Sequence, residues 1–292
     1  MEQKLSKKTR TESDLIGSRE VPESALYGVQ TLRGIENFRI SKFHLNEYPL
    51  FIQALAITKM GAAVANRELD LLTEEQTDAI LKACKEILEG KHHDQFPVDM
   101  IQGGAGTTTN MNANEVIANR AIEILGGQKG EYSVVHPIDH VNSGQSTNDV
   151  IPTAGKMTSL RLLQNLKKEL LRLHQALSRK ADEFDHVIKM GRTQMQDAVP
   201  IRLGQEFKAY SDAILRDIRR MEIAMDEMRT VNMGGTAVGT GLNADEAYLK
   251  RIVPNLNKVS DMEFVQAFDL IDATQNLDGG FRGCQGVRRH SV

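Results

Sequence analysis

The chain has 292 residues, of which 40% are hydrophobic and 5% aromatic, and its formal net charge is −3. This length allows one or two domains with a sizeable core, and the interspersed acidic and basic residues argue against a nucleic-acid-binding surface. The two cysteines, Cys84 and Cys284, exclude a disulfide framework, and no apolar run approaches the roughly 20 residues that cross a bilayer, so we expect a cytoplasmic protein without membrane contact.

The first half of the chain is predicted to be a mostly helical domain. We expect residues 1–13 to form a disordered arm and residues 14–145 to form the domain, with an irregular segment up to about residue 48. Thr73 and Gln76 have the spacing of a capping box at the start of one helix. Hydrophobic periodicity and turn residues set the other boundaries. The expected helices cover residues 48–67, 73–90 and 112–125.

Two long periodic segments follow. Residues 152–185 carry leucines three or four positions apart, and residues 201–230 carry aromatic residues, isoleucines and methionines in the same rhythm. Helices of this length need apolar partners along their whole extent, so we expect residues 146–278 to form part of a long central helix bundle in an oligomer. The last segment, 279–292, has no helical stripe and is expected to be a tail.

Three polar stretches precede predicted long helices. They are "GGAGTTTNMNANE" at 103–115, "VNSGQSTNDVIPT" at 141–153 and "KMGRTQMQDAVPIRLGQ" at 189–205. In the second stretch, Pro152 suits the first position of a helix. Each stretch offers hydroxyl or amide groups. The residues concerned are Thr107, Ser146, Thr147, Asn148, Thr193 and Gln194.

These donors suggest a site for a small anion, because the first two stretches also lie at the positive ends of helix dipoles. The alternative is that the same residues only cap their helices, which is the ordinary use of Ser, Thr and Asn. No Gly-Lys-Ser/Thr string follows the glycines, and "GGTAVGTG" at 234–241 lacks the dinucleotide-binding spacing. A carboxylate therefore fits better than a nucleotide, and the sequence predicts no metal site.

Four strings, taken in order and spacing, resemble the aspartase/fumarase superfamily: "GGAGTTTNMNANE", "GQSTNDVIPT", "KMGRTQMQDAVPIRLGQEF" and "GGTAVGTGLN". "YGVQTLRGIENF" at 27–38 adds a match, and the resemblance covers about residues 12–278. The aspartate ammonia-lyase branch is the most similar. This chain has "IQGGAGT" where fumarases carry Trp-Gln-Thr-Gly-Ser-Gly-Thr, and Gln194 where they carry His.

The resemblance implies an aspartase/fumarase-like fold of mostly helical domains, with a tetrameric central helix bundle. It implies reversible elimination of ammonia from L-aspartate to give fumarate, with no organic cofactor and with a small dicarboxylate as the ligand. It also assigns roles to the polar stretches. Thr107, Ser146 and Thr147 would hold the β-carboxylate, Asn148 would contact or position the amino group, and Thr193 and Gln194 would hold the α-carboxylate.

One part of the family pattern is missing. The family's base is a serine in a loop of the form Gly-Ser-Ser-x-Met-Pro-x-Lys-x-Asn-Pro, and this string does not occur in the chain. The pattern stops after "DATQNLDG", so we expect a C-terminally truncated aspartate ammonia-lyase polypeptide that is inactive alone. Two alternatives stay open. One is a fumarate hydratase or another lyase of the superfamily, and the other is a non-catalytic helical assembly module.

Overall fold

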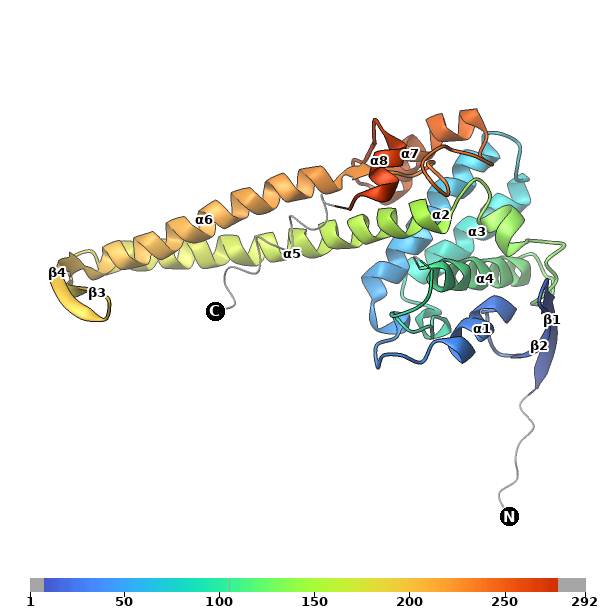
Figure 1. Cartoon of the computed structure of the whole chain (residues 1–292), viewed down its shortest axis with the longest axis horizontal. Helices are drawn as coiled ribbons and strands as arrows, with labels where there is room; N and C mark the ends of the chain where they lie inside the picture. The colour runs from blue at the N-terminus through green and yellow to red at the C-terminus, as the bar shows by residue number, and fades with distance from the viewer. Residues whose placement is uncertain (1–7, 105, 278–292) are drawn as a thin grey trace, which may run out of the picture. The chain divides into compact units, whose positions relative to one another are not determined.

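The computed structural model describes residues 8–104 and 106–277 and is mainly helical, as predicted (Figure 1). None of the described helices is long and apolar enough to cross a membrane. The elements in chain order are β1 (Thr9–Asp14), β2 (Gly17–Pro22), α1 (Val29–Asn37), η1 (Leu45–Glu47), α2 (Pro49–Arg67), α3 (Glu74–Leu88), η2 (His93–Gln95), α4 (Thr107–Ile124), η3 (Pro137–Val141), α5 (Thr147–Glu183), β3 (Ile188–Thr193), β4 (Gln196–Arg202), α6 (Leu203–Met228), β5 (Thr230–Val231), α7 (Glu246–Ser260), β6 (Val265–Gln266) and α8 (Leu270–Gln275).

Contacts divide the chain into two units. The first contains the described residues up to Thr158 together with Arg229–Leu277, and the second contains Ser159–Met228. The predicted boundary at residue 146 therefore differs from the division by contacts, which places α7, α8 and the first turns of α5 with the N-terminal helices. The reason is that α7 packs along α2. The predicted tail at 279–292 lies outside the described residues.

The core of the first unit is built around α2. This helix packs against α3, α4 and α7, and it is buried on most of its circumference. Its sequence explains this position, because its alanines and large aliphatic residues leave no continuous polar face. The predicted capping box at the start of α3 is confirmed, since Thr73 and Gln76 exchange side-chain to backbone hydrogen bonds of 3.1 and 3.2 Å.

Helix α1 lies in the segment predicted to be irregular. Its N-cap residue, Gly28, offers no side chain. Instead, the buried carboxylate of Glu115 in α4 accepts hydrogen bonds from the backbone N–H groups of Gly28, Gln30 and Thr31 at 2.8–3.0 Å. Further along α1, Gly34 passes so close to Thr108 that no side chain fits between the two helices. The cap comes from a residue 84–87 positions away, which a local pattern cannot reveal.

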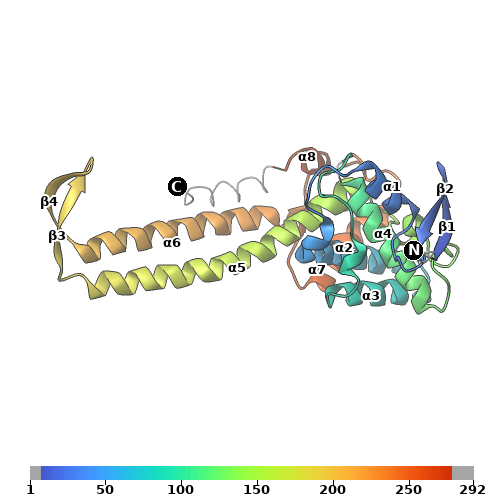
Figure 2. The same ribbon diagram turned by 90° about the horizontal axis from the view of Figure 1, so that it is seen from below.

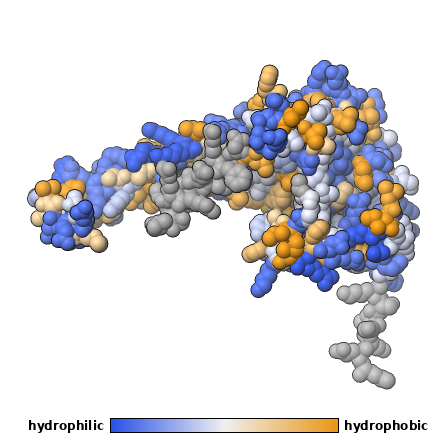
Figure 3. All heavy atoms as spheres, viewed as in Figure 1, coloured by the Kyte–Doolittle hydropathy of each residue, from blue (hydrophilic) through white to orange (hydrophobic). Residues whose placement is uncertain are grey.

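The second unit consists of the later turns of α5, the β3–β4 hairpin and α6 (Figure 2). Ser159–Glu183 and α6 run side by side (Figure 1, Figure 2), linked by a 2.8 Å hydrogen bond between His174 and Ser211. At their ends, the rings of Phe184 and Phe207 are in contact at an angle of 40°. Figure 3 shows hydrophobic and hydrophilic residues exposed together at the hairpin end. The two predicted rods are confirmed as helices.

Three predicted boundaries are wrong. Residues 9–13 of the expected disordered arm belong to β1, which pairs with β2 in an antiparallel hairpin. Helix α4 starts at Thr107 instead of about residue 112. Helix α5 starts at Thr147 and not at Pro152. The missing N–H of Pro152 leaves the carbonyl oxygen of Asn148 without a helical donor, and Asn232 Nδ2 donates to that oxygen at 2.9 Å instead.

Candidate functional site

The first turns of α4 and α5 meet in the first unit. Gly106 caps α4 with φ of 92°, a left-handed conformation that favours glycine, and a Cβ there would lie 3.0–3.3 Å from the side chain of Ile151 in α5. Asn110 Nδ2 donates a 3.3 Å hydrogen bond to Thr147 Oγ1. Two of the three predicted stretches thus bring Thr107 and Thr147 to neighbouring helix starts, where the dipoles favour negative charge.

The hydroxyl groups at these helix starts retain protons to donate. Ser146 Oγ accepts a hydrogen bond from the backbone N–H of Asn148 at 3.2 Å, so Ser146 does cap α5, in agreement with the alternative interpretation. Thr147 Oγ1 already accepts from Asn110, and Thr107 is exposed. Because an occupied lone pair leaves the O–H free, these groups can still bind an anion.

The side chain of Asn148 can offer a ligand its amide oxygen, while its NH₂ group donates within the protein. Its Nδ2 donates to the carbonyl oxygen of Ala237 at 2.7 Å, in the glycine-rich turn at 234–241. Its Oδ1 has no hydrogen-bond partner among the described residues. The amide oxygen is therefore available to a positively charged amino group, in agreement with the role implied by the resemblance.

Asp149 anchors the start of α5 to the same turn. Its carboxylate accepts hydrogen bonds from the backbone N–H groups of Ser146 at 3.0 Å, Gly234 at 3.3 Å and Thr236 at 3.0 Å. Burial raises the pKa of Asp149 to about 6, and these hydrogen bonds and the charge of Lys59 oppose the shift. The glycine-rich turn at 234–241 is thus held against the start of α5.

A buried lysine lies beneath the two helix starts. Lys59 in α2 is fully buried, and its Nζ donates to Asn110 Oδ1 at 2.8 Å, Asn142 Oδ1 at 2.8 Å and Gln145 Oε1 at 2.9 Å. Burial lowers the pKa of Lys59 to about 7, against the opposing influence of Asp149 and of Cys84. Sequence reasoning missed this lysine. Its signal was a single charge within the apolar run "LFIQALAITKMGAAVAN".

The third predicted stretch belongs to the second unit. Thr193 and Gln194 lie at the tip of the β3–β4 hairpin, where Gln194 and Met195 adopt φ of 48° and 61°. Both side chains are exposed. These values of φ are those of a two-residue hairpin turn, so this stretch precedes α6 without forming its first turn. Its role in binding stays a prediction.

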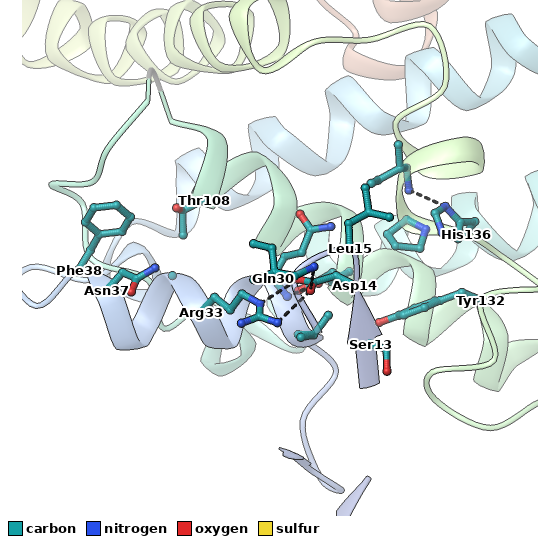
Figure 4. A pocket seen from close by; sticks show the side chains of 16 residues that line it. Ser13, Asp14, Leu15, Gln30, Arg33, Asn37, Phe38, Thr108, Tyr132 and His136 are labelled. Atoms are coloured by element: carbon teal, nitrogen blue, oxygen red, sulfur yellow. Dashed lines mark hydrogen bonds and ion pairs between the residues drawn. The ribbon is translucent and has the colours of Figure 1, made fainter. Parts of the chain in front are cut away.

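A pocket of the first unit lies elsewhere, beside α1 (Figure 4). It has a volume of about 770 Å³ and includes Thr108 but none of the predicted site residues. Arg33 and Asp14 face each other in it and form paired hydrogen bonds of 2.8 and 2.9 Å. The guanidinium also donates to the carbonyl oxygen of Gly17, so it is largely committed to the protein itself. In residues 8–104 and 106–277, no group of three metal-binding side chains gathers.

Comparison with known proteins supports the sequence resemblance. Residues 17–281 match a protein family described as lyase. The aspartate ammonia-lyase of Bacillus subtilis (strain 168) is 53% identical over 272 residues, which is 93% of this chain and 57% of that protein. The aspartate ammonia-lyase of Helicobacter pylori (strain J99) is 51% identical over 278 residues, covering 95% of this chain and 59% of that protein.

Solved structures show the same fold. The fumarate lyase:delta crystallin from Brucella melitensis, determined with bound cobalt, matches with a TM-score of 0.93 at 46% identity, covering 97% of this chain and 61% of that one. A class II fumarase from Schistosoma mansoni matches with a TM-score of 0.90 at 33% identity, covering 96% and 62%. The chain thus spans roughly 57–62% of the length of these relatives. The match over residues 17–281, the sequence identities and the shared fold together show that the chain belongs to this lyase family.

Proposed function

We propose that this chain carries part of the substrate site of an aspartate ammonia-lyase, which eliminates ammonia from L-aspartate to give fumarate. The observation that carries the proposal is the pair of neighbouring helix starts at Thr107 and Thr147, whose hydroxyl groups keep their protons for an anion. The relatives named aspartate ammonia-lyase support the same reaction.

The chemistry explains why such donors are needed. The proton on Cβ of aspartate is weakly acidic because it neighbours an ionised carboxylate. Its removal places a second negative charge on that carboxylate, and the C–N bond then breaks to release ammonia. Donors fixed in advance bind this charge more strongly than the ground state, which lowers the barrier. We assign this binding to Thr107, Ser146 and Thr147, and the contact with the amino group to Asn148.

Two parts of the proposal lie beyond the first unit. Thr193 and Gln194 are proposed to bind the α-carboxylate, as the resemblance implies. The chain is also proposed to form a homo-oligomer, a tetramer by the same resemblance. Apolar side chains on α5 and α6 support this, since Leu162, Tyr210 and Ile223 are 53%, 52% and 63% exposed. The buried free thiol of Cys84 supports our proposal of a cytoplasmic location.

Binding of fumarate by this chain, measured by calorimetry, tests the donor role. Thr147→Val removes the hydroxyl and should weaken binding by about 10- to 100-fold, as expected for a lost hydrogen bond to a charged group. Thr147→Ser should restore it. Thr153→Val is the matched control, because Thr153 is fully buried in the same helix and its hydroxyl has no partner in the described chain. Equal affinities for the Val and Ser variants of Thr147 would contradict the donor role.

L-aspartate and L-malate then separate the possible reactions. An ammonia-lyase site should prefer L-aspartate, and Asn148→Ala should remove that preference by deleting the acceptor for the amino group. A preference for L-malate would favour a fumarate hydratase. If neither compound nor fumarate binds, a helical assembly module without a substrate site is the better description.

A further inference from the structure

The ammonium group of Lys59 is saturated by three amide oxygens. One comes from Asn110 in α4, and the other two come from Asn142 and Gln145, just before α5. An ammonium has three donors and no acceptor, so it forces the oxygen atom of each amide to face it. The NH₂ group of each amide must therefore point away from Lys59.

Asn110 connects Lys59 to the proposed substrate site, because its amide contacts both Lys59 and Thr147. With its oxygen on Lys59, Asn110 directs Nδ2 toward Asn142 Oδ1 at 3.1 Å and toward Thr147 Oγ1 at 3.3 Å. If the amide were reversed, its oxygen would accept the hydroxyl proton of Thr147 and withdraw that donor from the site. The side chain of Lys59 itself has no hydrogen bond to Thr147 or Ser146 among the described contacts.

We propose that Lys59 is a positioning residue of the substrate site: its ammonium group orients the amide of Asn110 so that the hydroxyl proton of Thr147 stays available to the substrate carboxylate. This inference rests on the proposed role of Thr147. Packing alone does not require a charge at this position, because burying an ammonium is costly and a methionine of similar volume fills the same space without that cost. The charge is explained by the three amides that it orients.

Among the described residues, the ionisable groups that influence the pKa of Lys59 are Asp149 of α5 and Cys84 of α3, and Asp149 in turn influences Tyr248 of α7. Burial raises the pKa of both Cys84 and Tyr248, so Asp149 is the one of these groups that carries charge near neutral pH. Loss of the Lys59 proton converts a triple donor into a group with two donors and one lone pair. One amide oxygen then faces that lone pair and is repelled by it. If this amide reverses, its NH₂ group can donate a hydrogen bond to the lone pair instead. The pKa of about 7 places this change near neutral pH.

The first test compares Lys59→Met with Lys82→Met, a control at an exposed position of α3. Calorimetry measures fumarate binding from about pH 6.5 to about pH 8.5, a range in which Asp149, with a pKa of about 6, is mostly ionised. Wild type and Lys82→Met should lose about tenfold in affinity as the pH rises, the equivalent of one hydrogen bond. Lys59→Met should bind at least tenfold more weakly throughout, with a flat pH profile. An unchanged affinity and profile in Lys59→Met would overturn the proposal.

A second test needs neither a ligand nor a variant. In the nuclear magnetic resonance spectrum of the wild-type chain, the side-chain amide signals of Asn110, Asn142 and Gln145 should shift together with pH, with a midpoint near 7. The methyl signal of Thr147 should follow them. Shifts with different midpoints for these groups would refute the positioning role even if Lys59→Met did not fold. A chain that shows these shifts but binds no fumarate would instead refute the proposed function.

Discussion

Replacement of Glu115 by glutamine should destabilise the first unit strongly, although the two side chains have nearly the same shape. Glu115 Oε2 accepts from the N–H groups of Gly28 and Thr31 at 2.8 and 3.0 Å and from the hydroxyl of Thr31 at 2.6 Å. Oε1 accepts from the N–H of Gln30 at 2.9 Å. The carboxylate thus replaces the cap that Gly28 cannot supply.

The magnitude follows from these four bonds. Glutamine keeps one oxygen, so three bonds survive without the charge and the fourth donor meets an NH₂ group. A buried donor without a partner costs about 1–3 kcal/mol, and each bond to a charged acceptor exceeds a neutral one by up to ~1 kcal/mol. We therefore expect Glu115→Gln to lower the free energy of unfolding by about 3–5 kcal/mol, a large share of the usual ~5–15 kcal/mol.

Urea unfolding followed by circular dichroism near neutral pH measures this loss. Glu75→Gln, in the exposed first turn of α3, is the matched control and should change stability by less than about 0.5 kcal/mol. A loss below about 1 kcal/mol for Glu115→Gln would mean that the carboxylate does not hold the start of α1 as we have argued.

Two further predictions concern packing and charge. Gly34→Ala places a Cβ against Thr108 and should lower the free energy of unfolding by about 1–3 kcal/mol. Gly155→Ala, with no atom within 4 Å of its Cβ, should raise it by ~0.5–1 kcal/mol. Urea unfolding measures both changes, and changes of the same sign would contradict this reasoning. Hydrogen bonding to Arg120 lowers the pKa of Glu86 to about 2, so its contribution is present above the unfolded value of 4.5 and is lost as the pH falls toward 2. Glu86→Gln should therefore cost about 1–2 kcal/mol near pH 7, after allowance for solvent screening, and much less near pH 2. A cost that does not vary with pH would exclude this ion pair as its source.

Much of the helical architecture could be predicted from the sequence, because it depends on residues close together in the chain. The capping box at Thr73 and the long apolar stripes of α5 and α6 follow from local patterns, whereas the starts of α4 and α5 lie about five residues earlier than those patterns indicated. The resemblance carried by the polar stretches also identified the family, since those stretches keep their order and spacing.

The tertiary structure decided which groups these patterns leave available. The cap of α1, the donor to the carbonyl oxygen of Asn148 and the partners of Lys59 all come from residues 51–87 positions away. No local periodicity encodes such pairings. The residue types and the existence of the helices were therefore determined by the sequence. The tertiary structure decided which polar groups remain free for a substrate, because the packing of distant helices places the other groups in hydrogen bonds within the protein.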